Sequence, residues 1–299
     1  MPTTPNLHVA SVTLRVADLP RVSAFYRDVL GLEVVFEDDR VVGLGSGGVV
    51  LVVLDQQSVR AGAQAGPRST GLFHTAFLYP TRRALAGGLA RVVAARWPLD
   101  GAADHGVSEA LYLADPEGNG VELYWDRPRA QWPPPQQPGE RVGMFTAALD
   151  VRALLADADP AAGERLGGPG DPDLGVGHAH LKVADVEAST GFYTRVLGLD
   201  LMCTYGQDAA FLAAGGYHHH VGANCWYSRG GSPPPAGAPG LARVTFGVGD
   251  EAAVQAVFER LDALGAAPHR DADATVLVTD PDSIQLAVTV SPRNPTAQT

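Results

Sequence analysis

A carboxylate within an apolar strand is the first residue of this sequence that could do chemistry. Glu122 interrupts the segment Gly-Val-Glu-Leu-Tyr-Trp at 120–125, whose composition otherwise favours a buried strand. Burying a carboxylate is costly unless it is paired or binds a metal ion. His105 and Tyr112 precede it within one hairpin's length. The segment 104–125 therefore brings an imidazole, a phenol and a carboxylate close together, although Glu122 alone could equally face water at a strand edge.

Histidines are the second group of candidates. His74 and His178 each lie in an apolar segment that predicts a strand, and three consecutive histidines occupy 218–220. An imidazole can bind a divalent metal, or can act as an acid and a base near neutral pH. A single histidine on an apolar strand is nevertheless more often a hydrogen-bonded core residue, and the cluster at 218–220 could be a solvated strand end. Only a fold that brings these residues together would give them a common function.

An internal repeat predicts such a fold. The segments 11–34 and 178–201 agree at about ten of 24 positions, with Val-Ala-Asp, Phe-Tyr and Val-Leu-Gly-Leu in register. Each predicts a strand, an aspartate near a helix N-cap and an amphipathic helix. Two further segments lead from a strand to a helix after Gly-Leu, and each ends in a hairpin that Asp-Pro opens. The chain is therefore predicted to be α+β, with four β-α-β-β-β modules at roughly 8–54, 71–126, 176–227 and 240–291.

A proline-rich segment separates the second module from the third. We expect a first repeat at 1–126, a linker at 127–175 and a second repeat at 176–299. Within the linker, one short helix is expected near 144–156. The linker is long enough to cross a domain.

Composition excludes several classes of function. The chain has 299 residues and a formal net charge of −11, which offers no basic surface to nucleic acid or to an anionic membrane. Its two cysteines, Cys203 and Cys225, make neither a disulfide framework nor a zinc motif. The sequence has no signal-peptide pattern and no apolar run of 18 residues. We therefore expect a cytoplasmic protein whose partner is a small molecule, and a homodimer is compatible with sheet edges left open between the modules.

The repeated modules resemble the vicinal oxygen chelate superfamily, which includes glyoxalases, bleomycin-resistance proteins and type I extradiol dioxygenases. The resemblance covers nearly all of the chain except the linker and the tails. It implies that two modules pack side by side and that their sheets curl around a metal ion. It also implies that first strands carry histidine ligands and that last strands carry a glutamate.

Transferred residue by residue, this pattern places metal ligands at His74, Glu122 and His178, which lie in modules two and three. Two histidines and one carboxylate are the arrangement expected of non-haem Fe(II) oxygenases. The resemblance therefore implies that module two pairs with module three around the metal. Modules one and four would then pair as a metal-free half, and an exchange between subunits could deliver the same contacts. The positions taken as equivalent in that half hold Ser11, Arg243 and Gln285, none of which suits a divalent metal.

A further match favours the extradiol dioxygenases over the glyoxalases. In those enzymes His-Gly-Val-Ser precedes a strand whose tyrosine lies three residues before the Asp-Pro turn and ten before the metal glutamate. Here His105, Tyr112 and Glu122 keep those spacings. The resemblance assigns His105 to the dioxygen or the cleaved intermediate, and Tyr112 to a substrate oxygen.

The resemblance also assigns a catalytic acid and base to the last strand of module three. His219 fits this role first, because a small residue follows it three positions later, and His220 fits second. On a regular strand, alternation would put His218 and His220 together on the face opposite His219.

The sequence therefore predicts an extradiol ring-cleaving dioxygenase that opens a catechol-type ring beside the diol. The resemblance implies Fe(II), or alternatively Mn(II), as the cofactor, with an aromatic diol and dioxygen as the substrates. Two alternatives stay open: a glyoxalase-like metal-dependent lyase or transferase, and a non-enzymatic protein that binds a small molecule in the same crevice.

Overall fold

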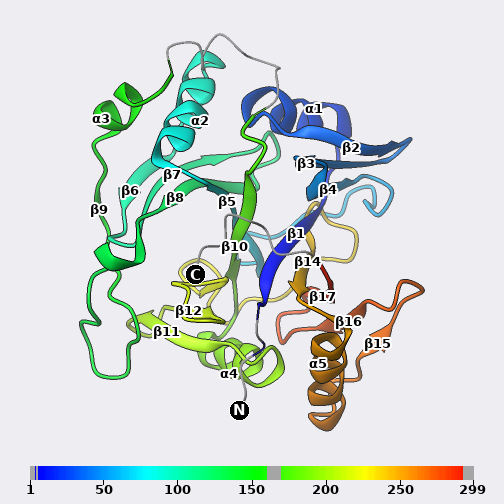
Figure 1. Ribbon diagram of the computed structural model, residues 1–299. Coiled ribbons are helices and arrows are strands. Elements are labelled where there is room, and N and C mark those ends of the chain that lie inside the picture. Colours follow the sequence, from blue (N-terminus) through cyan, green and yellow to red (C-terminus); the bar gives the residue numbers. More distant parts are fainter. Residues whose placement is uncertain (1–3, 5, 160–169, 292–299) are drawn as a thin grey trace.

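Two curled sheets with helices on their outer sides organise the computed structural model, which describes residues 4, 6–159 and 170–291 (Figure 1). The fold is mixed α+β and consists of repeated modules, as the sequence predicts. Each of the four modules begins with a strand, continues through a helical segment and ends with three strands.

The bounds of the modules follow the glycine and Asp-Pro turns of the sequence. Module one comprises β1 (His8–Arg15), α1 (Leu19–Ala24) with a π-helical turn (Phe25–Val29), β2 (Glu33–Asp38), β3 (Val41–Ser46) and β4 (Val49–Asp55). Module two comprises β5 (Gly71–Tyr79), α2 (Arg82–Ala94), β6 (Gly101–Asp104), β7 (Ser108–Ala114) and β8 (Gly120–Asp126). Module three comprises β10 (Gly175–Lys182), α4 (Val186–Val196), β11 (Asp200–Tyr205), β12 (Ala209–Ala213) and β13 (Val221–Asn224). Module four comprises β14 (Gly240–Val248), α5 (Glu251–Ala263), β15 (His269–Arg270), β16 (Val276–Thr279) and β17 (Gln285–Val290).

Short polar side chains determine where the helices begin. The Oδ1 atom of Asp185 accepts a hydrogen bond from the backbone N–H of Ala188 at 3.0 Å, at the start of α4. Asp250 does the same for Ala253 at 2.8 Å, at the start of α5. Each aspartate satisfies a donor that the first helical turn leaves without a partner. The two N-cap aspartates expected from the repeat are Asp18 and Asp185, and both are present, since Oδ1 of Asp18 accepts from the N–H of Arg21 at 3.1 Å at the start of α1.

The two sheets combine modules from opposite ends of the chain. One sheet has the strand order β11-β12-β13-β10-β5-β8-β7-β6-β9 and joins module three to module two. The other has the order β15-β16-β17-β14-β1-β4-β3-β2 and joins module four to module one. In both sheets the first strands of two modules pair antiparallel at the centre. The expected pairing of module two with module three is confirmed, and it occurs within one chain.

The strand register corrects one of the equivalences drawn from the sequence. Glu122 of β8 pairs with Ala76, which lies two residues after His74 in β5. In the other sheet, Gln285 pairs directly with Arg243. Ala287, like Glu122, pairs with the residue two positions further along the first strand. The position equivalent to Glu122 is thus Ala287, and Gln285 was misaligned by two residues. Both last strands place this position, Glu122 in one hairpin and Ala287 in the other, seven residues after the aspartate of Asp-Pro.

The linker has more structure than its composition suggests. It contains a 3-10 turn (Arg129–Gln131), the two-residue strand β9 (Ala147–Ala148) and the expected short helix, α3 (Val151–Ala156). β9 extends the nine-stranded sheet by pairing with β6. Residues 160–169 of the linker lie outside the described residues. The division into 1–126, 127–175 and 176–299 stays a prediction.

The helices are too short or too polar to cross a lipid bilayer, as far as the described ranges extend.

Candidate metal centre

Three adjacent strands in the middle of the nine-stranded sheet carry the three expected ligands. His74 lies in β5, Glu122 in β8 and His178 in β10. Ala76 of β5 is paired with Glu122 on one side and with His178 on the other. Because His74 and Ala76 are two residues apart on one strand, they point to the same face. The small Ala76 side chain leaves room for the three larger ones to meet above it.

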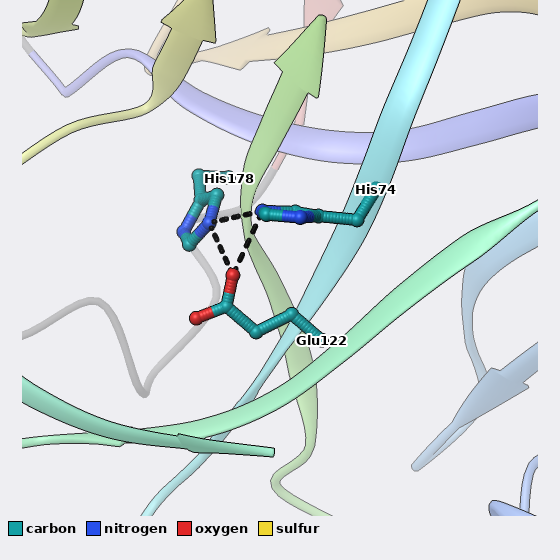
Figure 2. Close-up of side chains that lie close together, drawn as sticks. All are labelled: His74, Glu122 and His178. Atoms are coloured by element: carbon teal, nitrogen blue, oxygen red, sulfur yellow. Dashed lines mark hydrogen bonds and ion pairs between the residues drawn. The ribbon is translucent and has the colours of Figure 1, made fainter. Parts of the chain in front are cut away.

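The ligand atoms of the three residues converge on one point (Figure 2). The Nε2 atom of His74 lies 2.8 Å from Oε2 of Glu122, and Nε2 of His178 lies 3.1 Å from the same oxygen. The two Nε2 atoms are 3.3 Å apart. The side chains of His74, Glu122 and His178 are all buried. The sheet therefore brings together residues that are 104 positions apart in sequence.

The electrostatics of this cluster favour the protonation states that a cation requires. Burial raises the pKa of Glu122, but the adjacent His178 and His74 outweigh it and hold that pKa well below its ordinary value. Burial lowers the pKa of His178 to about 4, against the opposing effect of Glu122. At neutral pH the carboxylate is thus ionised and the His178 imidazole is neutral, as metal coordination demands.

The donor set fits a divalent metal. Three atoms with lone pairs face each other away from water, where they repel one another unless a proton or a cation lies between them. The buried Nδ1 of His178 has no hydrogen-bond partner in the described part of the chain. A cation at Nε2 would itself place the proton of that ring on Nδ1.

A cavity of about 620 Å³ opens beside the cluster. Side chains of modules two and three and of the linker line it, and all three candidate ligands lie in its wall. This volume accommodates a single aromatic ring with substituents. Of the other residues assigned from the sequence, His105, Tyr112 and His219 also line it.

His105 and Tyr112 form a hydrogen-bonded pair in the cavity wall. The Nε2 atom of His105 is 2.7 Å from the hydroxyl of Tyr112, and its Nδ1 is 3.0 Å from the carbonyl oxygen of Phe145. The carbonyl can only accept, so Nδ1 carries the proton of a neutral ring and Nε2 accepts from Tyr112. Burial, followed by the charge of Glu122, raises the pKa of Tyr112 well above its ordinary value. Tyr112 therefore stays a hydrogen-bond donor.

The three consecutive histidines lie just before strand β13, which begins at Val221. The split expected of an alternating backbone, with His219 on one side and His218 and His220 on the other, agrees with the cavity lining. His219 lines the cavity, and its ring centroid lies 4.0 Å from that of His178. His220 is not among the described residues that line the cavity, and its Nδ1 accepts a hydrogen bond from the backbone N–H of Ala214 at 3.2 Å.

A chain of polar groups runs from His219 away from the cavity. The Nδ1 atoms of His219 and His218 are 2.8 Å apart, and Nε2 of His218 donates to Asp126 Oδ1 at 2.7 Å. The hydroxyl of Tyr217 donates to Asp126 Oδ2, also at 2.7 Å. Asp126 therefore orients His218, which in turn contacts Nδ1 of His219 and leaves Nε2 of His219 outside this chain of contacts.

Sequence reasoning missed two contributors to this site. Asp126 carried a usable signal, because it alternates with Glu122 and Tyr124 along β8 and so shares their face. Phe145 contributes only its backbone carbonyl, so its side-chain type gave no signal. Its position next to His105 depends on how the linker folds back over module two.

Comparison with known proteins gives a family and several relatives. The model of the Glyoxalase/Bleomycin resistance protein/Dioxygenase superfamily matches residues 8–123 and 175–288. The catechol-2,3-dioxygenase of Bacillus subtilis (strain 168) is 39% identical over 237 residues, which cover 79% of this chain and 81% of that protein. The biphenyl-2,3-diol 1,2-dioxygenase 3 of Rhodococcus globerulus is 33% identical over 139 residues, or 42% of this chain and 66% of that protein.

Solved structures with low sequence identity share the fold. Glyoxalase I from Zea mays superimposes with a TM-score of 0.55 at 18% identity, covering 97% of this chain and 93% of that one. The cppA protein from Streptococcus pneumoniae TIGR4 gives a TM-score of 0.52 at 11% identity, covering 95% of this chain and 99% of that one. At such identities the likeness concerns the fold alone.

Proposed function

The chain belongs to the Glyoxalase/Bleomycin resistance protein/Dioxygenase superfamily, and from that membership we propose that it is an extradiol ring-cleaving dioxygenase. The reaction would open a catechol-type ring at the carbon–carbon bond beside its two hydroxyl groups. Both atoms of dioxygen enter the product, so no external reductant is needed. The observation that carries the proposal is the convergence of His74, Glu122 and His178 in the wall of a ring-sized cavity. Similarity to a protein named catechol-2,3-dioxygenase supports it.

We propose His74, Glu122 and His178 as the metal ligands, with Fe(II) as the metal and Mn(II) as the alternative. When bound there, a divalent iron ion would supply Lewis acidity that favours ionisation of the diol, and electron exchange with dioxygen. Two neutral imidazoles and one carboxylate leave further coordination positions for small reactants. That arrangement is typical of oxygen-activating sites and less suited to a glyoxalase, in which four protein ligands are expected.

His219 is proposed as the acid and base that moves protons in the cavity. Burial, followed by the charges of the neighbouring histidines, lowers the pKa of His219 well below its ordinary value, so the imidazole is neutral and can accept a proton from the diol. The contact with His218 occupies Nδ1, which leaves Nε2 for the substrate. His220, the second choice, lies outside the described cavity lining.

Tyr112 and His105 are proposed to hold the substrate and the cleaved intermediate. The Tyr112 hydroxyl has a single proton, which it donates to Nε2 of His105 and would redirect to a substrate oxygen on binding, while the Phe145 carbonyl fixes the His105 ring. Such a prepositioned donor stabilises negative charge that develops on a substrate oxygen.

The direct test is turnover by protein that is reconstituted anaerobically with Fe(II). Catechols added with oxygen should give a yellow muconic semialdehyde, with one dioxygen consumed per ring opened. No product from a broad catechol panel, with iron fully loaded, would overturn the proposal. Isomerisation of a thiol adduct with nickel or zinc, without oxygen uptake, would favour a glyoxalase-like activity instead. A protein that binds no stoichiometric metal would be a binding protein.

A further inference from the structure

The cavity contains one positively charged side chain among its described lining residues, and that side chain is the only lysine in the chain. Lysine and arginine together number 22, and Lys182 is the single lysine among them. All the other residues counted among these 22 are arginines. Lys182 lies at the end of β10, the strand that carries the metal ligand His178.

Lys182 lies on the cavity side of its strand. His178, His180 and Lys182 are spaced two residues apart, so their side chains share one face of β10. All three line the cavity. At about 3.3 Å per residue, Lys182 begins about 13 Å along the strand from His178. Its flexible four-carbon stem can bring the ammonium group back toward the metal centre.

Aromatic rings line the path between the metal centre and Lys182. The ring centroid of Phe73 lies 5.1 Å from that of His180 and 5.4 Å from that of Trp226. Trp226, 44% exposed, and Tyr227, 68% exposed, also line the cavity. An elongated aromatic ligand could therefore place its ring at the metal and a side chain along this path.

The equivalent cation in module one has a structural role that Lys182 does not share. Arg15 follows Ser11 at the same interval at which Lys182 follows His178. The Nε and NH2 groups of Arg15 donate to the backbone carbonyls of Ala238 and Leu241, each at 3.0 Å. The ammonium group of Lys182 has no hydrogen-bond or ion-pair partner within the described residues. Its ammonium group is half-buried, and burial lowers its pKa.

A half-buried ammonium without a partner costs free energy that an anion from a ligand would offset. We propose that Lys182 binds a carboxylate carried by the substrate, and that the substrates of this site are catechols with a short acidic side chain. This rests on the proposed ring-opening function. The diol would lie at His74, Glu122 and His178, and the carboxylate would lie toward Trp226.

The test compares each acid with its own uncharged ester. The probes are catechols with a carboxymethyl or carboxyethyl chain on ring carbon 3 or 4, and the methyl ester of each. Affinity is measured by calorimetry on protein loaded with zinc, which does not react with oxygen. Lys182→Met should weaken binding of the acid about 10- to 100-fold more than binding of the ester, because a charge-assisted hydrogen bond is lost. Lys182→Arg should restore part of the difference. In the iron-loaded protein, Lys182→Met should raise the KM of the acid more than the KM of the ester by a similar factor, with kcat little changed.

A matched control removes one positive charge elsewhere. The Arg83 side chain is 72% exposed, and Arg83→Met should leave the ratio of acid to ester affinity as it is. Thermal unfolding of each variant checks that it is folded. The single lysine also allows a direct readout: reductive methylation with ¹³C-formaldehyde labels Lys182 and the α-amino group only. The acid, and not the ester, should shift the lysine methyl signal.

Each outcome separates this inference from the proposed function. If wild type and Lys182→Met show the same ratio of acid to ester affinity, the carboxylate subsite is overturned, even if neutral catechols are opened. If no catechol is opened by the iron-loaded protein but the acid binds through Lys182, the subsite stands and the ring-opening proposal falls.

Discussion

At the scale of residues, Glu122 and its two histidine neighbours carry the proposal of a metal site. The carboxylate is 3% exposed and shares one oxygen with two imidazole nitrogens at 2.8 and 3.1 Å. His180 lies on the same strand as His178 and is equally buried, yet its Nε2 is 3.0 Å from the side-chain amide nitrogen of Asn224, which donates to it. His178 and His180 thus share one face of the strand but have different partners, so substitutions at the two positions can be compared directly.

His178→Gln should abolish stoichiometric metal binding, whereas His180→Gln should retain it. The first change removes one of three ligand atoms, and the second removes a ring that Asn224 already engages. Elemental analysis after dialysis against Fe(II) or Mn(II) measures both. Full metal content in His178→Gln would contradict the ligand assignment, and the His180→Gln variant controls for damage to the strand.

Tyr112→Phe should lower kcat for ring opening about 100-fold while leaving metal content unchanged. The change removes the hydroxyl that lies 2.7 Å from His105 and so removes a donor to the substrate. Steady-state kinetics on the iron-loaded protein, with metal determined in the same samples, provides the measurement. An unchanged kcat would exclude Tyr112 from the chemistry.

At the scale of elements, an Asp-Pro hairpin links two modules that are consecutive in sequence but belong to different sheets. In module four, Oδ1 of Asp280 accepts from the N–H groups of Asp282 and Ile284 at 2.9 and 2.8 Å. Its Oδ2 accepts from the hydroxyl of Tyr193, in helix α4 of module three, at 2.9 Å. The tyrosine of the repeated Phe-Tyr motif is therefore a contact between a helix and a hairpin of another module.

The pH dependence of stability should carry the signature of Asp280. Burial raises its pKa to about 6. A raised carboxyl pKa means that the folded state binds the proton more tightly than the unfolded state does. The protonated carboxyl group therefore contributes to the free energy of unfolding at low pH, and this contribution is lost as pH rises from about 4 through about 6. The amount is on the order of 3 kcal/mol. Asp280→Asn, which stays uncharged, should flatten this part of the profile.

Urea unfolding of wild type and Asp280→Asn between pH 4 and 8 measures the effect. The variant should lose less stability than wild type over the range in which Asp280 ionises. Parallel profiles for the two proteins would show that Asp280 is not the group responsible. Asp271→Asn, at an exposed turn of the same module, serves as the matched control.

The elements show which parts of the fold could be predicted and which could not. The repeat, its N-cap aspartates and its glycine and Asp-Pro turns are local signals, so all four modules could be bounded from the sequence. The conformation at 218–220 could not, because a histidine run reads equally as a strand or as the bend that precedes one. The role of the Phe145 carbonyl depends on tertiary folding of the linker, for which a backbone atom gives no sequence signal.

At the scale of the whole molecule, the two sheets have the same plan but different residues at the centre. The proposed metal ligands His178, His74 and Glu122 correspond to Ser11, Arg243 and Ala287 in the other sheet. Pairing of the outer modules could be inferred from the distribution of ligands, but the exact equivalences required the register. The oligomeric state stays a prediction.

One metal ion per chain is the stoichiometry we expect. The second sheet offers a hydroxyl, a guanidinium and a methyl group at the equivalent positions, and none of these binds a divalent cation well. Elemental analysis, referenced to protein concentration from amino-acid analysis, should give a ratio near one. A ratio of two would show that the second half also holds a metal, and a ratio of one half would point to a site shared by two chains.

The central pairing of β5 with β10 also governs the order of events during synthesis. While the ribosome is still translating the linker, the edge of β5 that pairs with β10 in the folded protein has no partner. The edge of β1 that pairs with β14 stays unpaired for longer, because β14 is translated later. A nascent chain that contains only the first two modules holds two of the three proposed ligands, so we expect it not to retain a cation. Exposed strand edges of this kind are prone to mispairing, so we expect slow maturation that benefits from chaperones, with metal acquisition as a late step that follows release of the third module.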